Sequence, residues 1–244
     1  MADIKKRMEN YKKAGCKKKK GEFAKSPGRI IIIIAFNSII FFLSCISLRE
    51  EYPEIHYYRL IQTEAAFQNN EIGSIEGTLQ IRNFSASDAI DNDHFLGIWD
   101  NNEVQVYYYH RWIANAADLF TDFLITRYND LKVFTGGVVK PGSILIPDYI
   151  LEGQIIDMTA YNTKDSKQSN YAYISVRFSL VKKVPLSTDK TILINKVLSV
   201  KSPRKNNSVE TIAPAFSIAV SQISDQMILE IQDAIRKDRQ IIDD

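Results

Sequence analysis

Residues 171–180 read Tyr-Ala-Tyr-Ile-Ser-Val-Arg-Phe-Ser-Leu, the clearest strand pattern in the chain. Its even-numbered positions are apolar and its odd-numbered positions are aromatic or polar. An alternation of period two is typical of a β-strand with one face on a core and one face in water. Tyr171 and Tyr173 are expected on the solvent face.

Two further strands are predicted on either side of this stretch. Residues 149–161 are rich in apolar side chains, and the phase of the pattern shifts between Ile155 and Ile156, which predicts a β-bulge. Polar turns over 163–170 and 185–190 connect this strand to 171–180 and on to a third strand over 191–200. Three consecutive strands with short connections predict an antiparallel meander.

The first half of the chain predicts shorter strands and one helix. The expected strands cover residues 56–62, 75–81, 96–99, 103–109 and 131–134, the third and fourth forming a hairpin. Asn115 is suited to cap a helix whose positive end lies near Asp118. The buried stripe of that helix is expected to hold Ala116, Leu119, Phe120, Phe123, Leu124 and Tyr128.

A second, longer helix is predicted over residues 211–237, with Pro214 in its first turn. Its apolar stripe would be Ile212, Phe216, Ala219, Ile223, Met227, Ile231 and Ala234, and its opposite face Gln222, Asp225, Gln232 and Asp233. The predicted fold class is α+β: a mostly antiparallel sheet of about six to seven strands, with two long amphipathic helices packed on one face. A single domain would span residues 55–244.

The charge of the chain is unevenly distributed. Residues 1–44 carry eleven Lys or Arg against three Asp or Glu, which leaves 20 basic and 26 acidic residues in the remainder. The remainder is therefore mildly acidic, and it is not expected to bind nucleic acid, because such binding depends on Lys and Arg contacts to phosphate.

An apolar segment of fifteen residues, Ile30 to Ser44, follows the basic stretch. A signal-peptide core needs about 7–15 apolar residues and a membrane-spanning helix about 20, so residues 1–44 are predicted to be a signal peptide. Its closing sequence Phe42-Leu43-Ser44-Cys45 resembles the lipobox of bacterial lipoproteins. This resemblance implies cleavage before Cys45 and acylation of its thiol, with residues 45–54 as the lipidated N-terminus and tether. An uncleaved signal anchor ending near Leu48 is the alternative.

The mature sequence shows no catalytic constellation. It lacks a phosphate-binding loop with Lys followed by Ser or Thr and a G-x-S-x-G elbow, so no enzyme activity, catalytic residue or cofactor is predicted. The run Asp91-Asn-Asp-His94 is read as a turn, and no metal site is assigned. Glu152 and Asp157 are expected on opposite faces of one strand.

An aromatic run, Tyr107-Tyr-Tyr-His-Arg-Trp112, precedes the first helix. One interpretation is cross-strand aromatic packing. The other is a partner interface made by Tyr107, Tyr109, Arg111 and Trp112, because Tyr, Trp and Arg are enriched at interface hot spots.

Five segments together resemble a known family, the auxiliary lipoprotein component of ABC-type transport systems associated with MCE-domain proteins. They are Tyr57-Tyr-Arg-Leu60, residues 102–112 leading into a helix, residues 148–153, residues 171–180 and residues 215–223. The resemblance implies a non-catalytic periplasmic subunit that acts with an MCE-domain protein, a permease and an ATPase to move lipids or other hydrophobic substrates across the envelope.

The residue after the cysteine bears on location. Asp at that position retains many lipoproteins in the inner membrane, and here it is Ile46, which favours an anchor in the outer membrane facing the periplasm. A scaffold lipoprotein of a different secretion or envelope-integrity complex is the alternative function. Self-association into a homo-oligomer is compatible with both.

Overall fold

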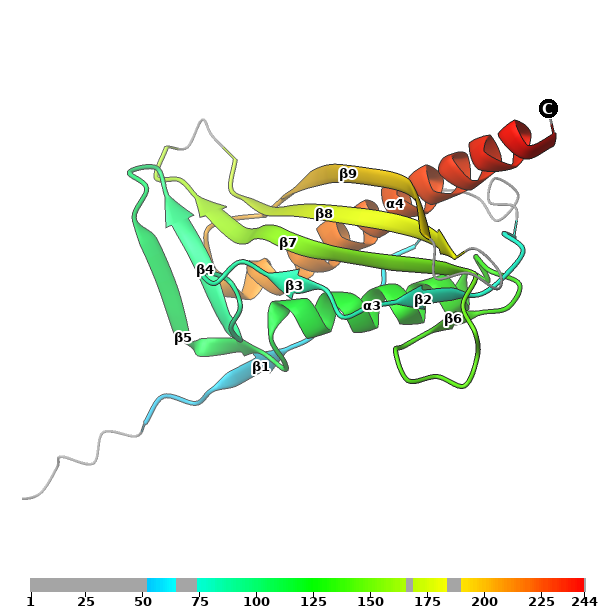
Figure 1. The fold of residues 1–244 in the computed structure, drawn as a ribbon. Helices are drawn as coiled ribbons and strands as arrows, with labels where there is room; N and C mark the ends of the chain where they lie inside the picture. Colours follow the sequence, from blue (N-terminus) through cyan, green and yellow to red (C-terminus); the bar gives the residue numbers. More distant parts are fainter. Residues whose placement is uncertain (1–51, 65–73, 166–168, 184–189, 244) are drawn as a thin grey trace, which may run out of the picture. The chain divides into compact units, whose positions relative to one another are not determined.

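The computed structural model describes residues 52–64, 74–165, 169–183 and 190–243 (Figure 1). Nearly all of them belong to one compact unit, Pro53–Asp244. The signal peptide and Cys45 lie outside the described residues.

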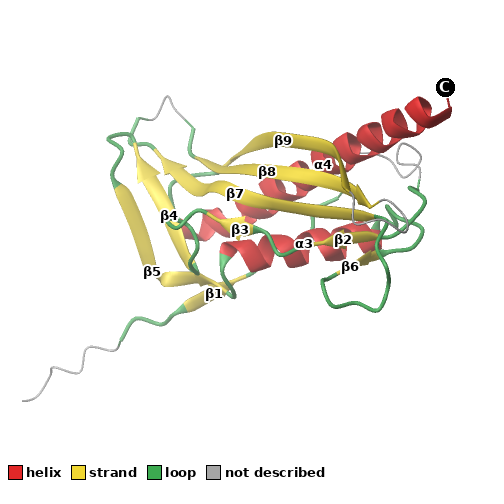
Figure 2. Ribbon diagram, viewed as in Figure 1, coloured by secondary structure: helices red, strands yellow, loops and turns green. Residues whose placement is uncertain are grey.

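Three long strands form the predicted antiparallel meander: β7 (Tyr149–Asn162), β8 (Tyr171–Lys183) and β9 (Lys190–Pro203) (Figure 2). The register of β7 against β8 shifts between Ile155 and Asp157, which confirms the bulge. Alternate side chains of β8 are fully buried, as the period of two requires.

The other edge of β7 is covered by three short parallel strands: β2 (Leu79–Ile81), β3 (Ser85–Ala86) and β4 (His94–Trp99). They pair with successive parts of β7, so residues 79–99 act as one interrupted strand. β5 (Val104–Trp112) is antiparallel to β4, while β1 (His56–Tyr58) is parallel to β5 and β6 (Val138–Val139) to β2. The described sheet has nine strands, whose long ladders are antiparallel and whose short ones are mostly parallel.

Three predicted strands differ from the structure. The strand over 56–62 ends at Tyr58, because the N–H groups of Ile61 and Thr63 donate to Ser217 and Ser221 rather than to a neighbouring strand. The strand over 75–81 begins only at Leu79, because Gly77 has a φ of +107° and Ile75 makes one isolated bridge to Phe134. Residues 131–134 form a turn rather than a strand, since Lys132 has a φ of +52°.

Both helices pack on the same face of the sheet (Figure 1). α3 (Ala116–Asp130) begins after Asn115, whose Oδ1 accepts from the backbone N–H of Asp118 at 2.8 Å, as predicted. α4 (Ile212–Asp243) follows the short 3₁₀ turn η1 (Val209–Thr211). The α+β fold class with two helices on one face is confirmed.

α4 is long and apolar enough to span a membrane, and no other helix among the described residues passes that test. However, 72% of its most apolar window is buried inside the domain. Its predicted stripe is buried from Ile212 to Ile231, whereas Ala234 is only half-buried. Asp225 was expected on the polar face and is buried instead, which corrects that expectation. Asp225 is buried because it forms an ion pair with Arg127 of α3.

Candidate functional site

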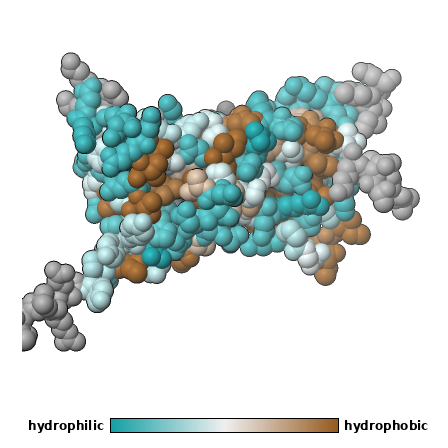
Figure 3. All heavy atoms as spheres, turned by 60° about the vertical axis from the view of Figure 1, so that its left-hand side comes forward, coloured by the Kyte–Doolittle hydropathy of each residue, from teal (hydrophilic) through white to brown (hydrophobic). Residues whose placement is uncertain are grey.

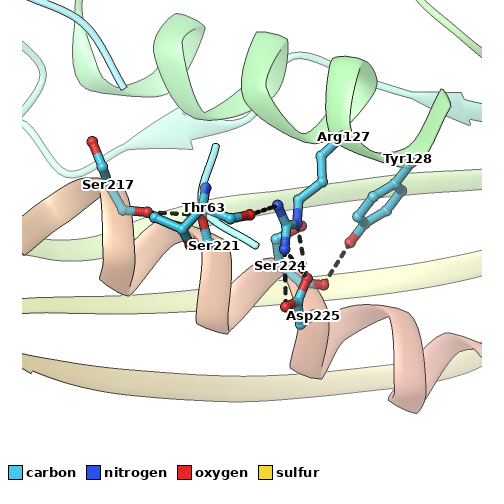
Figure 4. Close-up of polar contacts among 7 residues, drawn as sticks. All are labelled: Thr63, Arg127, Tyr128, Ser217, Ser221, Ser224 and Asp225. Atoms are coloured by element: carbon cyan, nitrogen blue, oxygen red, sulfur yellow. Dashed lines mark hydrogen bonds and ion pairs between the residues drawn. The ribbon is translucent and has the colours of Figure 1, made fainter. Parts of the chain in front are cut away.

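Residues 59–64 run as an extended segment along α4 (Figure 4). The Ser217 hydroxyl accepts from the backbone N–H of Ile61, and the Ser221 hydroxyl accepts from that of Thr63, both at 3.1 Å. Each serine in turn donates to the carbonyl four residues earlier in its own helix. The two serines therefore bind backbone N–H groups of this segment that a neighbouring strand would otherwise bind.

A buried ion pair connects the two helices next to this segment (Figure 4). Arg127 of α3 donates Nε and Nη2 to the two carboxylate oxygens of Asp225 of α4, at 2.8 and 3.0 Å. Arg127 Nη1 donates to the carbonyl of Thr63 at 2.9 Å. Beside it, Tyr128 donates its hydroxyl to the Ser224 carbonyl, and burial raises the pKa of Tyr128. One guanidinium thus joins both helices and the N-terminal segment.

Between this segment and the first turns of α4 lies an apolar groove of about 500 Å³. We call it the N-terminal groove, and its walls include Tyr57, Tyr58, Ile61, Ala213, Pro214 and Ile218. Tyr57, Ile61 and Ile218 are exposed, which is unusual for large apolar side chains that share one surface.

Charged and aromatic groups lie at the rim of the N-terminal groove. Arg59 and Glu210 also line it. The Ser208 hydroxyl and the backbone hold the pKa of Glu210 below its ordinary value, and the nearby His110 and His56 act in the same direction. Glu210 is therefore an anion at neutral pH.

Two stacked histidines stand next to this rim. The rings of His56 and His110 lie 5.1 Å apart, and Tyr58 shares a hydrogen bond of 3.0 Å with Nδ1 of His110. Burial raises the pKa of Tyr58, and the charge of Glu210 adds to this effect. These contacts fix β1, from which the segment of residues 59–64 continues.

The volume of the N-terminal groove lies within the range of about 300–1,000 Å³ that is typical of small-molecule sites. Its apolar walls suit an aliphatic chain or the apolar side of a partner segment, with Arg59 and Glu210 available to polar groups at the rim. In the described part of the chain, no three His, Cys, Asp or Glu side chains are grouped so as to hold a metal ion.

The structure separates the four residues of the predicted interface. Trp112 is 3% exposed and packs on Phe95 and Phe216 in the core, so the expectation that its ring forms part of an exposed interface is corrected. Trp112 is the last residue of β5, and its ring contact with Phe216 places it against the first turns of α4. Tyr107 is half-buried, and its hydroxyl accepts from Asn162 at 3.3 Å.

Tyr109 and Arg111 remain accessible. Tyr109 is 47% exposed. Arg111 is half-buried, donates Nε to the Tyr108 carbonyl at 3.1 Å and lies 3.5 Å from a carboxylate oxygen of Asp93. These two side chains could contact a partner, whereas Trp112 could not.

The polar loop before β4 has local partners. Asn92 accepts from the backbone N–H of His94 at 2.9 Å, and Asp93 lies 3.1 Å from the His94 ring. Residues 91–93 therefore form the polar connection that the sequence predicted, while His94 already belongs to β4.

Glu152 and Asp157 lie on the same face of the sheet, which corrects the expectation of opposite faces. They pair with Ser179 and Ser175 of β8, four residues apart, because the bulge removes one step of the alternation. Glu152 binds Arg82 at 2.9 Å, and Asp157 accepts from Thr159 and Tyr161.

The N-terminal groove was not predicted from the sequence. A signal was present in Ser217, Ser221 and Asp225, which recur every four residues in the predicted second helix. Such spacing places three polar groups on one line of a helix, and buried polar groups require partners.

Comparisons with known proteins agree on the fold and add no family. No family model matches the chain, and no curated protein matches it. Protein XCC0632 from Xanthomonas campestris, described as belonging to family DUF330, is similar in structure with a TM-score of 0.65 at 19% identity, over 75% of this chain and 98% of that one. An uncharacterized protein gives a TM-score of 0.53 at 12% identity, over 73% and 99% of the two chains. The α+β architecture is thus shared with solved structures, one of them of family DUF330.

Proposed function

We propose that this protein is a lipid-anchored envelope lipoprotein and a non-catalytic auxiliary subunit of an ABC-type, MCE-associated system that moves lipids or other hydrophobic substrates. Its N-terminal groove docks an apolar element of that system. The observation that carries this proposal is the groove itself, an open apolar site of about 500 Å³.

The position of the groove supports the proposal. Tyr57 lies twelve residues after Cys45, the residue of the lipobox-like sequence. A short tether would hold the domain near the bilayer, where apolar partners and lipids are concentrated. Two or more acyl chains anchor a protein stably, at about 0.8 kcal/mol per buried CH₂ group.

The rigidity of the groove also favours docking. One wall belongs to α4, and the other is held by Ser217, Ser221 and Arg127. A site that is already formed loses little conformational entropy on binding, so its exposed apolar area is available for affinity.

The test is a mild-detergent pull-down of the tagged full-length chain, with mass spectrometry of the proteins and lipids that co-purify. Ile61→Glu places a carboxylate in the groove, and Ile192→Glu is its matched control on β9. Ile61 is 60% exposed and Ile192 is 66% exposed, so neither change is expected to unfold the domain.

The expected result is that the unaltered chain and Ile192→Glu retain an MCE-domain protein, a permease or an ATPase. Ile61→Glu should lose at least about tenfold of this recovery, because burying an unpaired carboxylate is costly. Recovery of unrelated envelope proteins alone would move the function to a scaffold of a different complex. Equal recovery by the two variants would remove the groove from the proposal.

A further inference from the structure

One segment of the described sheet has an edge without a strand partner. β5 pairs with β4 through Val104–Tyr107 and Arg111, and β1 covers only His110, Arg111 and Trp112 on the other side. In the described residues no strand pairs with the outer edge of residues 104–109, which we call the free β5 edge. Figure 1 shows β5 at the margin of the sheet.

The composition of the free β5 edge is unusual for an exposed strand. Residues 104–109 read Val-Gln-Val-Tyr-Tyr-Tyr, with no charge and no proline, and Val104 and Tyr108 are exposed. Figure 3 turns this end of the domain toward the viewer and shows brown, apolar groups among the hydrophilic surface. Natural proteins block open edges with lysine or proline, because unpaired backbone groups recruit another strand.

The opposite edge of the same sheet provides the contrast. β9 pairs only with β8 in the described structure, and it carries Lys190, Lys196, Lys201 and Pro203. That edge has the expected protection, whereas the free β5 edge has none.

The backbone direction of the free edge follows from one hydrogen bond. Trp99 donates its N–H to the carbonyl of Glu103 at 3.0 Å, so Glu103 faces β4. The ladder to β4 follows this alternation through Tyr107, so Val104 and Val106 direct their N–H and C=O groups outward. The Tyr108 carbonyl accepts from Arg111 Nε and keeps a second lone pair.

We propose that the free β5 edge pairs antiparallel with the same edge of a second copy of this chain. A two-fold axis normal to the sheet keeps each side chain on its own face of the sheet. Even-numbered residues must therefore lie opposite even-numbered residues, and odd-numbered residues opposite odd-numbered ones. An axis at Val106 places Val104 opposite Tyr108 and Val106 opposite itself. The outward-facing Val106 then forms a hydrogen-bonded pair with its copy, and β1 is left in place.

The side chains in this register are complementary. Gln105 meets Tyr107, and each Val104 meets a Tyr108, an aromatic and β-branched pair that stabilises a sheet. Residues 104–108 carry no charge, so no charge is repelled or left unpaired when two copies meet. The contact is small, so the dimer is weak in dilute solution and forms where copies are concentrated.

Cysteine cross-linking of the full-length chain in whole cells tests this pairing. The self-paired position in such a ladder has a Cα separation of about 5.5 Å, which a disulfide accepts. Val106→Cys is the test variant, and Val197→Cys on β9, where Val197 is 46% exposed, is the control. The unaltered chain shows how much disulfide dimer Cys16 or Cys45 forms without an added cysteine. Such a dimer concerns the proposed lipid anchor and not the free β5 edge.

Under mild oxidant, Val106→Cys should give at least about tenfold more disulfide dimer than Val197→Cys, because the β9 edge carries lysine and proline and the free β5 edge carries neither. Adding Val104→Pro should remove most of this dimer, because it deletes an outward N–H and spares the β4 ladder. An unchanged melting temperature confirms that the variant is folded. Equal cross-linking by both cysteine variants, no dimer from a folded Val106→Cys chain, or cross-linking of Val106→Cys to a different protein would each overturn the proposal.

Discussion

Arg127 and Asp225 are 98 residues apart in the chain and form a two-point ion pair that is nearly inaccessible to solvent. The guanidinium also binds the Thr63 carbonyl, so one residue connects α3, α4 and the wall of the N-terminal groove. Desolvation of both ions is costly, and the pair tolerates it because each charge has its partner.

Asp225→Ala is therefore expected to lower the free energy of unfolding by about 3–5 kcal/mol, because it leaves a buried guanidinium unpaired. Urea denaturation measures the change. The double variant Arg127→Met, Asp225→Leu removes both charges and should recover most of the loss. If the double variant were as unstable as Asp225→Ala, the cost would come from packing rather than from the unpaired charge.

Trp112→Ala is expected to destabilise the domain by about 3–5 kcal/mol, because it empties a core site between Phe95 and Phe216. Tyr109→Ala, on the same strand but exposed, should change stability by about 0.5 kcal/mol or less. Thermal and urea unfolding of both variants provide the comparison. A fully stable Trp112→Ala variant that loses a partner would contradict the buried position of the ring.

Asp157 predicts a dependence of stability on pH. Burial raises the pKa of Asp157 above its ordinary value of 3.8, and hydrogen bonds from Thr159 and Tyr161 only partly offset this effect. The folded protein then binds the proton more tightly than the unfolded chain, so its stability falls as pH rises from 3.8 through the folded pKa. Asp157→Asn should remove this decline, as urea denaturation at several pH values would measure.

Thr159→Val serves as the second variant for Asp157. The Thr159 hydroxyl donates to Asp157 at 2.5 Å and lowers its pKa. Removing it should extend the decline to higher pH. An unchanged pH profile in both variants would mean that the Asp157 carboxyl is not perturbed in the folded protein.

The elements that local periodicity defines were predictable. The strand over 171–180, the bulge near Ile155 and the Asn115 cap all follow from side-chain spacing within one element, and the structure confirms them. Long-range pairing was not predictable in this way. The parallel pairing of β2, β3 and β4 with β7 joins residues about 60 to 70 positions apart, and no local pattern encodes it.

The site was less predictable than the fold for the same reason. Asp225 looks like a surface residue until Arg127 is placed beside it, and Ile61 looks like part of a strand until Ser217 accepts its N–H. The N-terminal groove arises from contacts between segments more than 150 residues apart. Trp112 shows the converse error, since an aromatic residue typical of interfaces is also typical of cores.

The lipid anchor gives the last prediction. Cys45→Ala should abolish acylation and leave the precursor uncut, because the lipobox-like sequence offers no other thiol at that position. The precursor would run larger on a gel by the mass of residues 1–44, and labelling with a fatty-acid analogue would not detect it. Cys16→Ala is the matched control, and it should mature and label normally, since Cys16 lies in the part predicted to be removed. A Cys45→Ala chain that is cut and labelled as usual would contradict the lipoprotein assignment, and the free β5 edge would be unaffected by that outcome.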